Sequence, residues 1–490
     1  MMIRKHIDLL VAIIWSIISI TRGLNFVTTQ GKLVESYEIG RAQRLFWCSL
    51  AIFFAIIAIY AFCKFFVNAI KNDGSERKIL IYALPFLFVF MSYFFITYVR
   101  AYNASYYQGD EKLVWDAAVN MYPYFFVYLS EIYLWSFFIL PTSIAPTIVK
   151  IFMEAMIMGY IVWRVKKYYK TKNAYFIYLL CMLSPFYTLG VEIHRMQWYS
   201  FIYLFVMVKL FFDIREKNNL PFKWVNVITM IFLISLLSVL RREGLYLILL
   251  GLILLLMAYG SISERRVTII MIAIFLVAEI IVYLPVLKNG MDEKGTTTTA
   301  IIVHMLGEKS LNRDVVSKEL EVLDKVFDIE IIDRYNTDMG IEAYDKNYYD
   351  EIGWNSNYYF IHREVVEATP EEIEDAYHNL ILKQPIVFLK SRIRAFLAAG
   401  REESAYNLYL PSFILLAELL YSIIKKNKEM LLIFGCVLIH ISITTLAMPA
   451  SFFKYFFEMY LMSYTFIIIV ILDNIKSRNL GTMLVADRRE

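Results

Sequence analysis

Three carboxylate side chains fall close together in the stretch from Gly109 to Ala118. Asp110 and Glu111 are adjacent, and Asp116 follows them. A carboxylate that comes within hydrogen-bond reach of a reacting hydroxyl can take its proton and act as a general base. Acidic residues also decorate the outer loops of membrane proteins without taking part in chemistry. The residues alone leave both interpretations open.

Basic side chains form a second group that could carry chemistry. His194 and Arg195 lie between two apolar segments, and so do Arg241 and Arg242. A guanidinium group matches phosphate oxygens by bidentate hydrogen bonding, so these positions predict binding of a phosphodiester. The alternative is that the side chains extend to lipid headgroups. The same two interpretations apply to a third basic group, which consists of Lys390, Arg392 and Arg394.

The sequence contains no motif for a metal site, a disulfide framework, ATP binding or a common hydrolase. The histidines between 304 and 378 lack the spacing of metal ligands, and all four cysteines fall in apolar runs, where we expect no disulfide and no zinc site. No Walker motif, nucleophile-elbow motif or zinc-protease motif is present, which argues against an ATP-driven pump and the common hydrolases. The 49 basic and 45 acidic residues nearly balance, so nucleic-acid binding is not indicated. We predict neither a metal nor a cofactor.

The elements that position these residues are apolar helices. Hydrophobic residues make up 59% of the chain and charged residues 19%, which is far more apolar than a soluble core of this length requires. A bilayer span needs about 20 apolar residues. By that criterion we predict an all-α polytopic membrane protein with about twelve transmembrane helices. The candidate segments are 7–22, 45–67, 79–99, 143–163, 174–193, 197–213, 222–240, 244–260, 267–287, 408–424, 430–449 and 455–475.

Basic residues orient these segments, because Lys and Arg accumulate on the cytoplasmic side. Alternation places both termini and the basic segment from Arg164 to Lys172 in the cytoplasm. The first outer loop is an exception, because it holds Arg22, Lys32, Arg41 and Arg44. The start of the chain resembles a signal peptide in its charge order, but no small-residue cleavage site follows, so we expect an uncleaved anchor.

Three regions follow from this topology. Residues 1–287 form transmembrane helices, with an outer loop near 100–140 that ends in a helix lying in the membrane interface. Residues 288–407 form a mainly helical extracytoplasmic domain, with helices expected from Asn312 to Phe327 and from Glu371 to Leu382, the second capped by Thr369. The segment from Ile386 to Ala399 is expected to run along the membrane surface. Residues 408–490 form the C-terminal transmembrane helices and a cytoplasmic tail.

Ionisable residues such as Glu154, Lys209, Glu279 and His440 fall within the predicted spans. An ionisable group inside hydrocarbon costs about 3 kcal/mol or more unless it faces a partner or water. Glu154, Lys209 and Glu279 therefore require partners, unless the first two lie near helix ends. His440 stands alone in an apolar segment, and we expect it to be a hydrogen-bonded packing residue.

The order of these features resembles the polyprenyl-phosphate-sugar-dependent membrane glycosyltransferases of the GT-C superfamily. The resemblance covers about residues 79–475 and rests on short segments. They are the Asp-Glu loop at 110–118, an aromatic segment at 122–125, Ser-Pro at 184–185, the turn at 240–245 and the entry at 380–388 into the last spans. The chain departs from the family in lacking a second acidic motif with metal-ligand geometry and an oligosaccharyltransferase acceptor signature.

The resemblance implies that a loop acid is the catalytic base. Asp110 takes the family's position for that base, because it comes first in the Asp-Glu pair. Glu111 and Asp116 are close alternatives, and Glu35 and Glu38 in the first outer loop are more distant ones. The basic residues at 194–195 and 241–242 would then hold the phosphate of the donor.

The resemblance implies transfer of a sugar from a polyprenyl phosphate to a hydroxyl group on a cell-surface glycan, lipid or protein. The chain would be a multi-pass protein of a bacterial plasma membrane, in contact with membrane lipids. Two other functions fit a similar topology. One is a polysaccharide polymerase that uses diphosphate-linked oligosaccharides, and the other is a non-enzymatic flippase of lipid-linked glycans, which would need charges along a continuous path.

Overall fold

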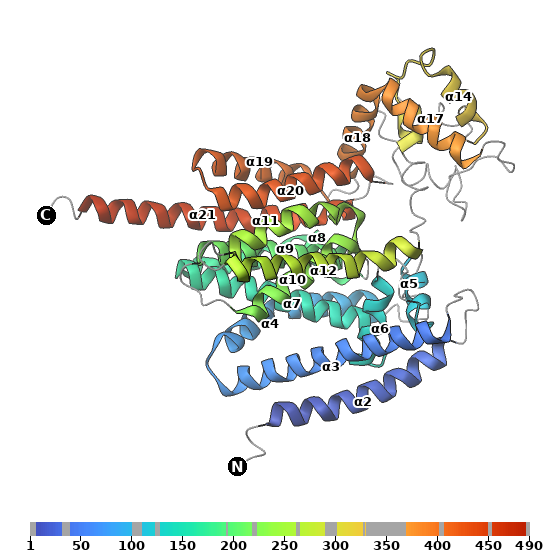
Figure 1. Ribbon diagram of the computed structural model, residues 1–490. Coiled ribbons are helices and arrows are strands. Elements are labelled where there is room, and N and C mark those ends of the chain that lie inside the picture. Colours follow the sequence, from blue (N-terminus) through green and yellow to red (C-terminus); the bar gives the residue numbers. More distant parts are fainter. Residues whose placement is uncertain are drawn as a thin grey trace. The chain divides into compact units, whose positions relative to one another are not determined.

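The computed structural model describes residues 6–31, 40–99, 110–122, 128–192, 195–217, 223–260, 265–289, 301–326, 329, 369–400, 406–448 and 453–486. Within these ranges the chain is helical and contains no β-strand, which confirms the predicted all-α class (Figure 1). The chain divides into two compact units. The first comprises 1–289, 416–433 and 461–490, and the second comprises 290–415 and 434–460.

Among the described residues, eight helical segments are long and apolar enough to cross a membrane. They lie on α2 (Ile7–Gln30), α3 (Arg41–Lys71), α4 (Ser75–Phe94) with the π-helical turn η2 (Phe95–Val99), α7 (Ala145–Tyr169), α9 (Arg195–Arg215), α12 (Arg265–Asn289), α20 (Lys428–Ala447) and α21 (Phe457–Ala486) with the turn η6 (Phe453–Phe456). Several long apolar helices of this kind are typical of a multi-pass integral membrane protein.

Shorter apolar helices occupy other predicted segments. These are α6 (Leu129–Ile139), α10 (Trp224–Leu240), α11 (Leu247–Tyr259) with the turn η4 (Arg242–Tyr246), and α19 (Tyr409–Ile424). At a rise of about 1.5 Å per residue, α6 is far shorter than the ~30 Å hydrocarbon layer. The sequence predicts a helix here that lies in the membrane interface, and the structure contains a short helix at this place.

The predicted span at 174–193 is divided in the structure. A 3₁₀-helix, η3 (Lys172–Met182), meets α8 (Ser184–Val191) at an angle of 71°. The break falls at Leu183, whose backbone is extended, and Pro185 lies in the first turn of α8. Proline provides no backbone N–H and clashes with a preceding helical turn, so it ends η3 and starts a new helix. The prediction of one continuous span at 174–193 followed the hydropathy and did not use Pro185 as a break.

Helix α7 is bounded by local signals and held closely against α4. Its first turn contains a proline, its last turn contains Lys166 and Lys167, and Lys170 ends it in a left-handed conformation. Gly159 lies at the contact with α4, where a Cβ atom would come within 2.6 Å of the Ile79 carbonyl oxygen and 2.7 Å of the Ala83 nitrogen. The two backbones therefore touch, and only glycine fits between them.

The second unit contains α14 (Ser317–Asp324), α17 (Pro370–Lys383) and α18 (Pro385–Ala399). The predicted cap of α17 is confirmed. Thr369 accepts a hydrogen bond from the Glu372 nitrogen, and the Glu372 side chain accepts one from the Thr369 nitrogen. The hydrogen bonds to the backbone and side chain of Thr369 lower the pKa of the Glu372 carboxyl group. An ion pair of 2.7 Å between Lys383 and Glu319 joins α17 to α14.

Candidate functional site

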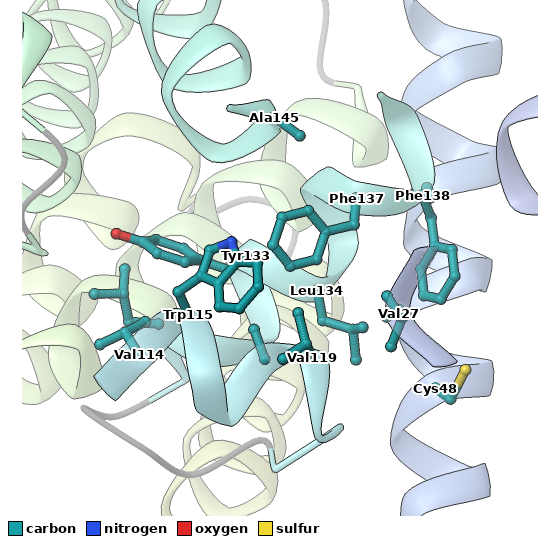
Figure 2. Packing of buried hydrophobic residues seen from close by; sticks show 14 of the residues in the cluster. Val27, Cys48, Val114, Trp115, Val119, Tyr133, Leu134, Phe137, Phe138 and Ala145 are labelled. Carbon is teal, nitrogen blue, oxygen red and sulfur yellow. The ribbon is translucent and has the colours of Figure 1, made fainter. Parts of the chain in front are cut away.

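The acidic stretch forms a short helix, α5 (Asp110–Val119), that packs against α6. Figure 2 shows the apolar residues between them, where Trp115 lies beside Phe137 with their ring centroids 6.3 Å apart. The Ser130 hydroxyl donates a 2.6 Å hydrogen bond to the Tyr122 carbonyl and ties the start of α6 to the end of α5. The chain thus forms two packed helices where the sequence predicted an outer loop that ends in one helix.

One apolar core braces this pair against the first two helices. It contains residues of α5 and α6 together with Val27 of α2, Cys48 of α3, Ala145 of α7 and Trp198 of α9. Figure 2 shows Val27 beside Phe138, with Cys48 on the neighbouring helix. Close packing of these large side chains stabilises the contact through many van der Waals interactions. The carboxylates of α5 are therefore carried on a fixed support.

The predicted carboxylates occupy different environments on α5. Asp116 is largely buried and pairs with Lys112 at 2.5 Å, one helical turn away. The Lys112 ammonium also lies 5.1 Å from the centre of the Trp115 ring. Glu111 is partly buried. Asp110 is the first residue of α5, and its side chain lies outside the described part of the structure, as do Glu35 and Glu38.

Sequence reasoning did not select a fourth carboxylate, Glu131, in the first turn of α6. Both of its side-chain oxygens are buried and have no hydrogen-bond partner among the residues that the structure describes. Glu131 is part of the α5–α6 pair, and α6 is not one of the eight candidate spans. Burial raises the pKa of the Glu131 carboxyl group from 4.5 to about 8. A single glutamate in an apolar, aromatic run was the available signal.

Glu131 should make stability fall as the pH rises. Between pH 4.5 and about 8 the unfolded chain has lost this proton while the folded chain keeps it. The free energy of unfolding should therefore decrease through that window by a few kcal/mol, since one pKa unit corresponds to about 1.4 kcal/mol. Glu131→Gln should flatten this dependence in thermal unfolding of the detergent-solubilised protein. Glu321→Gln, at an exposed position of α14, is the control. An unchanged pH slope in Glu131→Gln would contradict the assignment.

The four predicted phosphate-binding residues are only partly described. Arg241 is buried and forms a two-point contact with Glu243, with nitrogen–oxygen distances of 3.0 and 3.3 Å. Its guanidinium carbon also lies 5.2 Å from the centre of the Tyr199 ring. The side chains of Arg195 and Arg242 lie outside the described residues, and so does His194. The predicted turn at 240–245 is present as η4.

Glu154, Glu279 and His440, which the sequence places within spans, each have a polar partner, which lowers the cost of burying them. Lys150 pairs with Glu154 at 2.9 Å and donates a hydrogen bond to the Gly190 carbonyl. Glu279 accepts a 2.8 Å hydrogen bond from Ser238. In the second unit, His440 contacts Glu458 at 2.6 Å. This agrees with the prediction of a hydrogen-bonded packing histidine.

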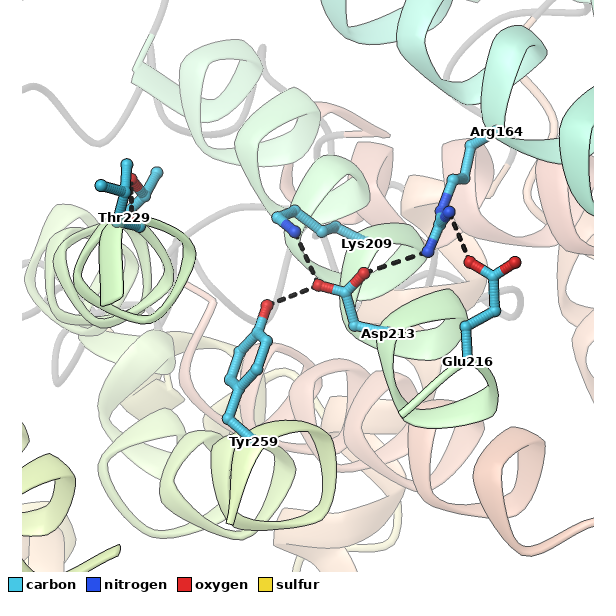
Figure 3. A network of polar contacts seen from close by, with 7 residues as sticks. Arg164, Lys209, Asp213, Glu216, Thr229 and Tyr259 are labelled. Carbon is cyan, nitrogen blue, oxygen red and sulfur yellow. Dashed lines mark hydrogen bonds and ion pairs between the residues drawn. The ribbon is translucent and has the colours of Figure 1, made fainter. Parts of the chain in front are cut away.

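A larger polar network involves Lys209, the remaining predicted residue (Figure 3). The Asp213 carboxylate contacts Lys209 at 2.6 Å, Arg164 at 3.1 Å and the Tyr259 hydroxyl at 2.5 Å. Arg164 also pairs with Glu216 at 2.5 Å. Two positive and two negative charges thus meet where α7, α9 and α11 pack together, and their opposite charges compensate one another.

The geometry can be compared with known proteins. Neither the family models, nor the curated proteins, nor the solved structures contain a match to this chain. The described residues also contain no cluster of three histidine, cysteine or acidic side chains arranged to hold a metal ion.

Proposed function

We propose that the chain is a membrane glycosyltransferase that moves a sugar from a polyprenyl phosphate to a hydroxyl acceptor. The observation that carries the proposal is the braced α5–α6 pair. Its acidic helix α5 is fixed on one face by a buried apolar core, while Glu111 and Asp116 lie off that core. Catalysis by a general base requires a carboxylate held in place, because small misplacements of a reacting group slow the reaction strongly.

The reaction assigns one role to each group. The acceptor oxygen forms a bond to the anomeric carbon of the sugar, and the bond from that carbon to the phosphate oxygen breaks. Asp110 accepts the hydroxyl proton, while the electron pair of the broken bond leaves with the polyprenyl phosphate. Arg242 stabilises the negative charge that develops on this phosphate. Glu111 and Asp116 are the alternatives for the base.

The buried contact between Arg241 and Glu243 suggests different roles for Arg241 and Arg242. With its guanidinium group engaged by Glu243 and Tyr199, Arg241 holds the turn η4 in place. Arg242 is then the member of the pair that contacts the donor phosphate. Arg195 and His194 supply further positive charge or hydrogen-bond donors to the same phosphate.

The proposed topology has about twelve crossings. The eight long helices supply most of these crossings, and the bent η3–α8 pair with α10, η4–α11 and α19 supplies the rest. Both termini are cytoplasmic, and residues 288–407 lie outside the cytoplasm of a bacterial plasma membrane. Basic residues at the cytoplasmic ends of the helices, such as Lys166 and Lys167, support this orientation.

Single cysteines test the orientation directly. In a cysteine-free background, Glu321→Cys on α14 should react in intact cells with a thiol reagent that cannot cross membranes. Lys172→Cys should react only after the membrane is opened, because it lies in a basic, cytoplasmic segment. Both positions are exposed in the structure, so a difference in reactivity reports sidedness. The opposite pattern of labelling would invert the topology and move α5 to the cytoplasmic side.

Reconstitution tests the reaction. The purified protein is placed in liposomes with a radiolabelled polyprenyl-phosphate hexose and a panel of glycan, lipid and peptide acceptors. We expect labelled product together with free polyprenyl phosphate. Transfer only from a diphosphate-linked oligosaccharide would identify a polymerase instead. Movement of intact donor between leaflets, without release of the carrier, would identify a flippase.

A further inference from the structure

Helix α18 of the second unit is amphipathic, and its apolar side is exposed. Val387, Arg392 and Ala395 are buried, so this side of the helix packs into the second unit. The other side carries Ile386, Leu389, Ile393 and Leu397 at three- and four-residue intervals, which aligns them in one stripe. Ile386 is 79% exposed, Leu389 50% and Ile393 57%. We call these four residues the α18 stripe.

The contacts of α18 place it at the ends of three apolar helices. The Tyr409 hydroxyl at the start of α19 donates a 3.0 Å hydrogen bond to the Leu397 carbonyl. Arg392 donates a 3.3 Å hydrogen bond to the carbonyl of Met448, which directly follows α20. The Phe396 ring meets Phe456, in the turn that begins the last candidate span, with 4.9 Å between ring centroids. All of these residues belong to the second unit.

This arrangement fixes the depth of the helix. Candidate spans include α20 and η6–α21, and a span ends where the hydrocarbon layer gives way to headgroups. A helix packed across such ends lies at the level of the headgroups. It is also not a span itself, because it carries three basic residues within its fifteen.

Two cations border the α18 stripe. Lys390 and Arg394 follow Leu389 and Ile393 by one residue each, so they lie along one edge of the stripe. Glu308 is buried and holds the Arg394 guanidinium at 3.2 Å, with the Lys390 ammonium at 3.8 Å. Lys390 remains 44% exposed at its side chain. Two cations share one carboxylate in these contacts, which leaves positive charge at the edge of an apolar face.

We propose that α18 lies in the membrane interface, with its stripe among lipid acyl chains and Lys390 beside anionic lipid phosphates. Interfacial helices combine an apolar face with basic residues in this way. The long, flexible side chain of lysine allows its ammonium group to reach phosphate oxygens. The helix thereby fastens the second unit to the bilayer surface. This surface is separate from the proposed transfer reaction, and its test does not depend on activity.

Fluorescence quenching measures the contact in the full-length protein. Single cysteines at Ile393 on the stripe and at Glu374, an exposed position of α17, are labelled with a small fluorophore in a cysteine-free background. The protein is reconstituted in vesicles of phosphatidylcholine and phosphatidylglycerol. A nitroxide on the lipid acyl chain should quench the label at 393 at least about twofold more than a soluble nitroxide does. The label at 374 should show the reverse preference.

The charge is tested separately with Lys390→Gln, which leaves Arg394 in place to pair with Glu308. In vesicles that contain phosphatidylglycerol, this variant should show weaker lipid quenching at 393 than the parent, and high salt should reduce the difference. If the soluble nitroxide quenches the label at 393 as strongly as the label at 374, the membrane contact is overturned. Unchanged lipid quenching in Lys390→Gln would overturn the phosphate contact. Circular dichroism confirms that each labelled variant is folded.

Discussion

Asp110→Asn should lower turnover in the reconstituted transfer assay by about a hundredfold or more, because a general base contributes roughly that factor to a reaction. The substitution keeps the size and polarity of the side chain and removes only its basicity. Asp110 begins α5, whose buried face is fixed against α6, so the backbone position of residue 110 should not change. Donor binding and membrane insertion should therefore stay normal. Turnover with saturating donor and the dissociation constant for donor are the two measurements.

The neighbouring carboxylates are the controls for this prediction. Asp116→Asn removes the partner of Lys112, and Glu111→Gln changes a partly buried side chain on the same helix. Both variants should retain most of the activity, since neither residue is assigned to proton transfer. If Asp110→Asn works at the wild-type rate while one of the other two loses activity, the base is that residue. Full activity in all three variants would rule out a base on α5.

Asp213→Ala should destabilise the folded protein by about 3–5 kcal/mol. Removing one partner of a buried ion pair leaves the other charge buried without compensation, and such changes cost this much. Asp213 is buried and contacts Arg164, Lys209 and Tyr259. Glu216 would still pair with Arg164, but Lys209 would lose its 2.6 Å contact. Thermal unfolding and reversible denaturation in detergent measure the loss.

An exposed aspartate provides the matched control. Asp73 faces its partner Arg77 at 3.9 Å, and both side chains are exposed. Asp73→Ala should change the free energy of unfolding by less than about 1 kcal/mol, because solvent screens an exposed pair. If the two alanine variants unfold at the same temperature, the network in Figure 3 contributes little to stability.

Local signals in the sequence predicted local structure well. The Thr-Pro-Glu-Glu start of α17 has the predicted cap, because a capping box depends only on residues within one turn. The short helix at α6 was expected from a proline-flanked aromatic run that is too interrupted to span. The division of 174–193 into η3 and α8 was not expected, although Pro185 was visible, because hydropathy does not record a change of direction.

Pairings between distant segments could not be predicted from the sequence. Lys209 and Glu154 had been recognised as residues that require partners, but nothing in the sequence joins Arg164 to Asp213, which lie on separate helices. The burial of Glu131 could not be predicted either, because it depends on how α6 packs against α2, α3 and α5. The role of Asp110 rests on resemblance and on its position in α5, because packing cannot reveal which carboxylate meets a substrate that is absent from the fold.

The touching backbones of α4 and α7 bear on how the α5–α6 pair is supported. This pair is connected to α4 on one side and to α7 on the other, so both of its connections lead to helices that are in direct contact. A side chain larger than hydrogen at position 159 would collide with Ile79 or Ala83 and push the two helices apart. A glycine outside the acidic segment is therefore part of what holds the support of the α5–α6 pair together.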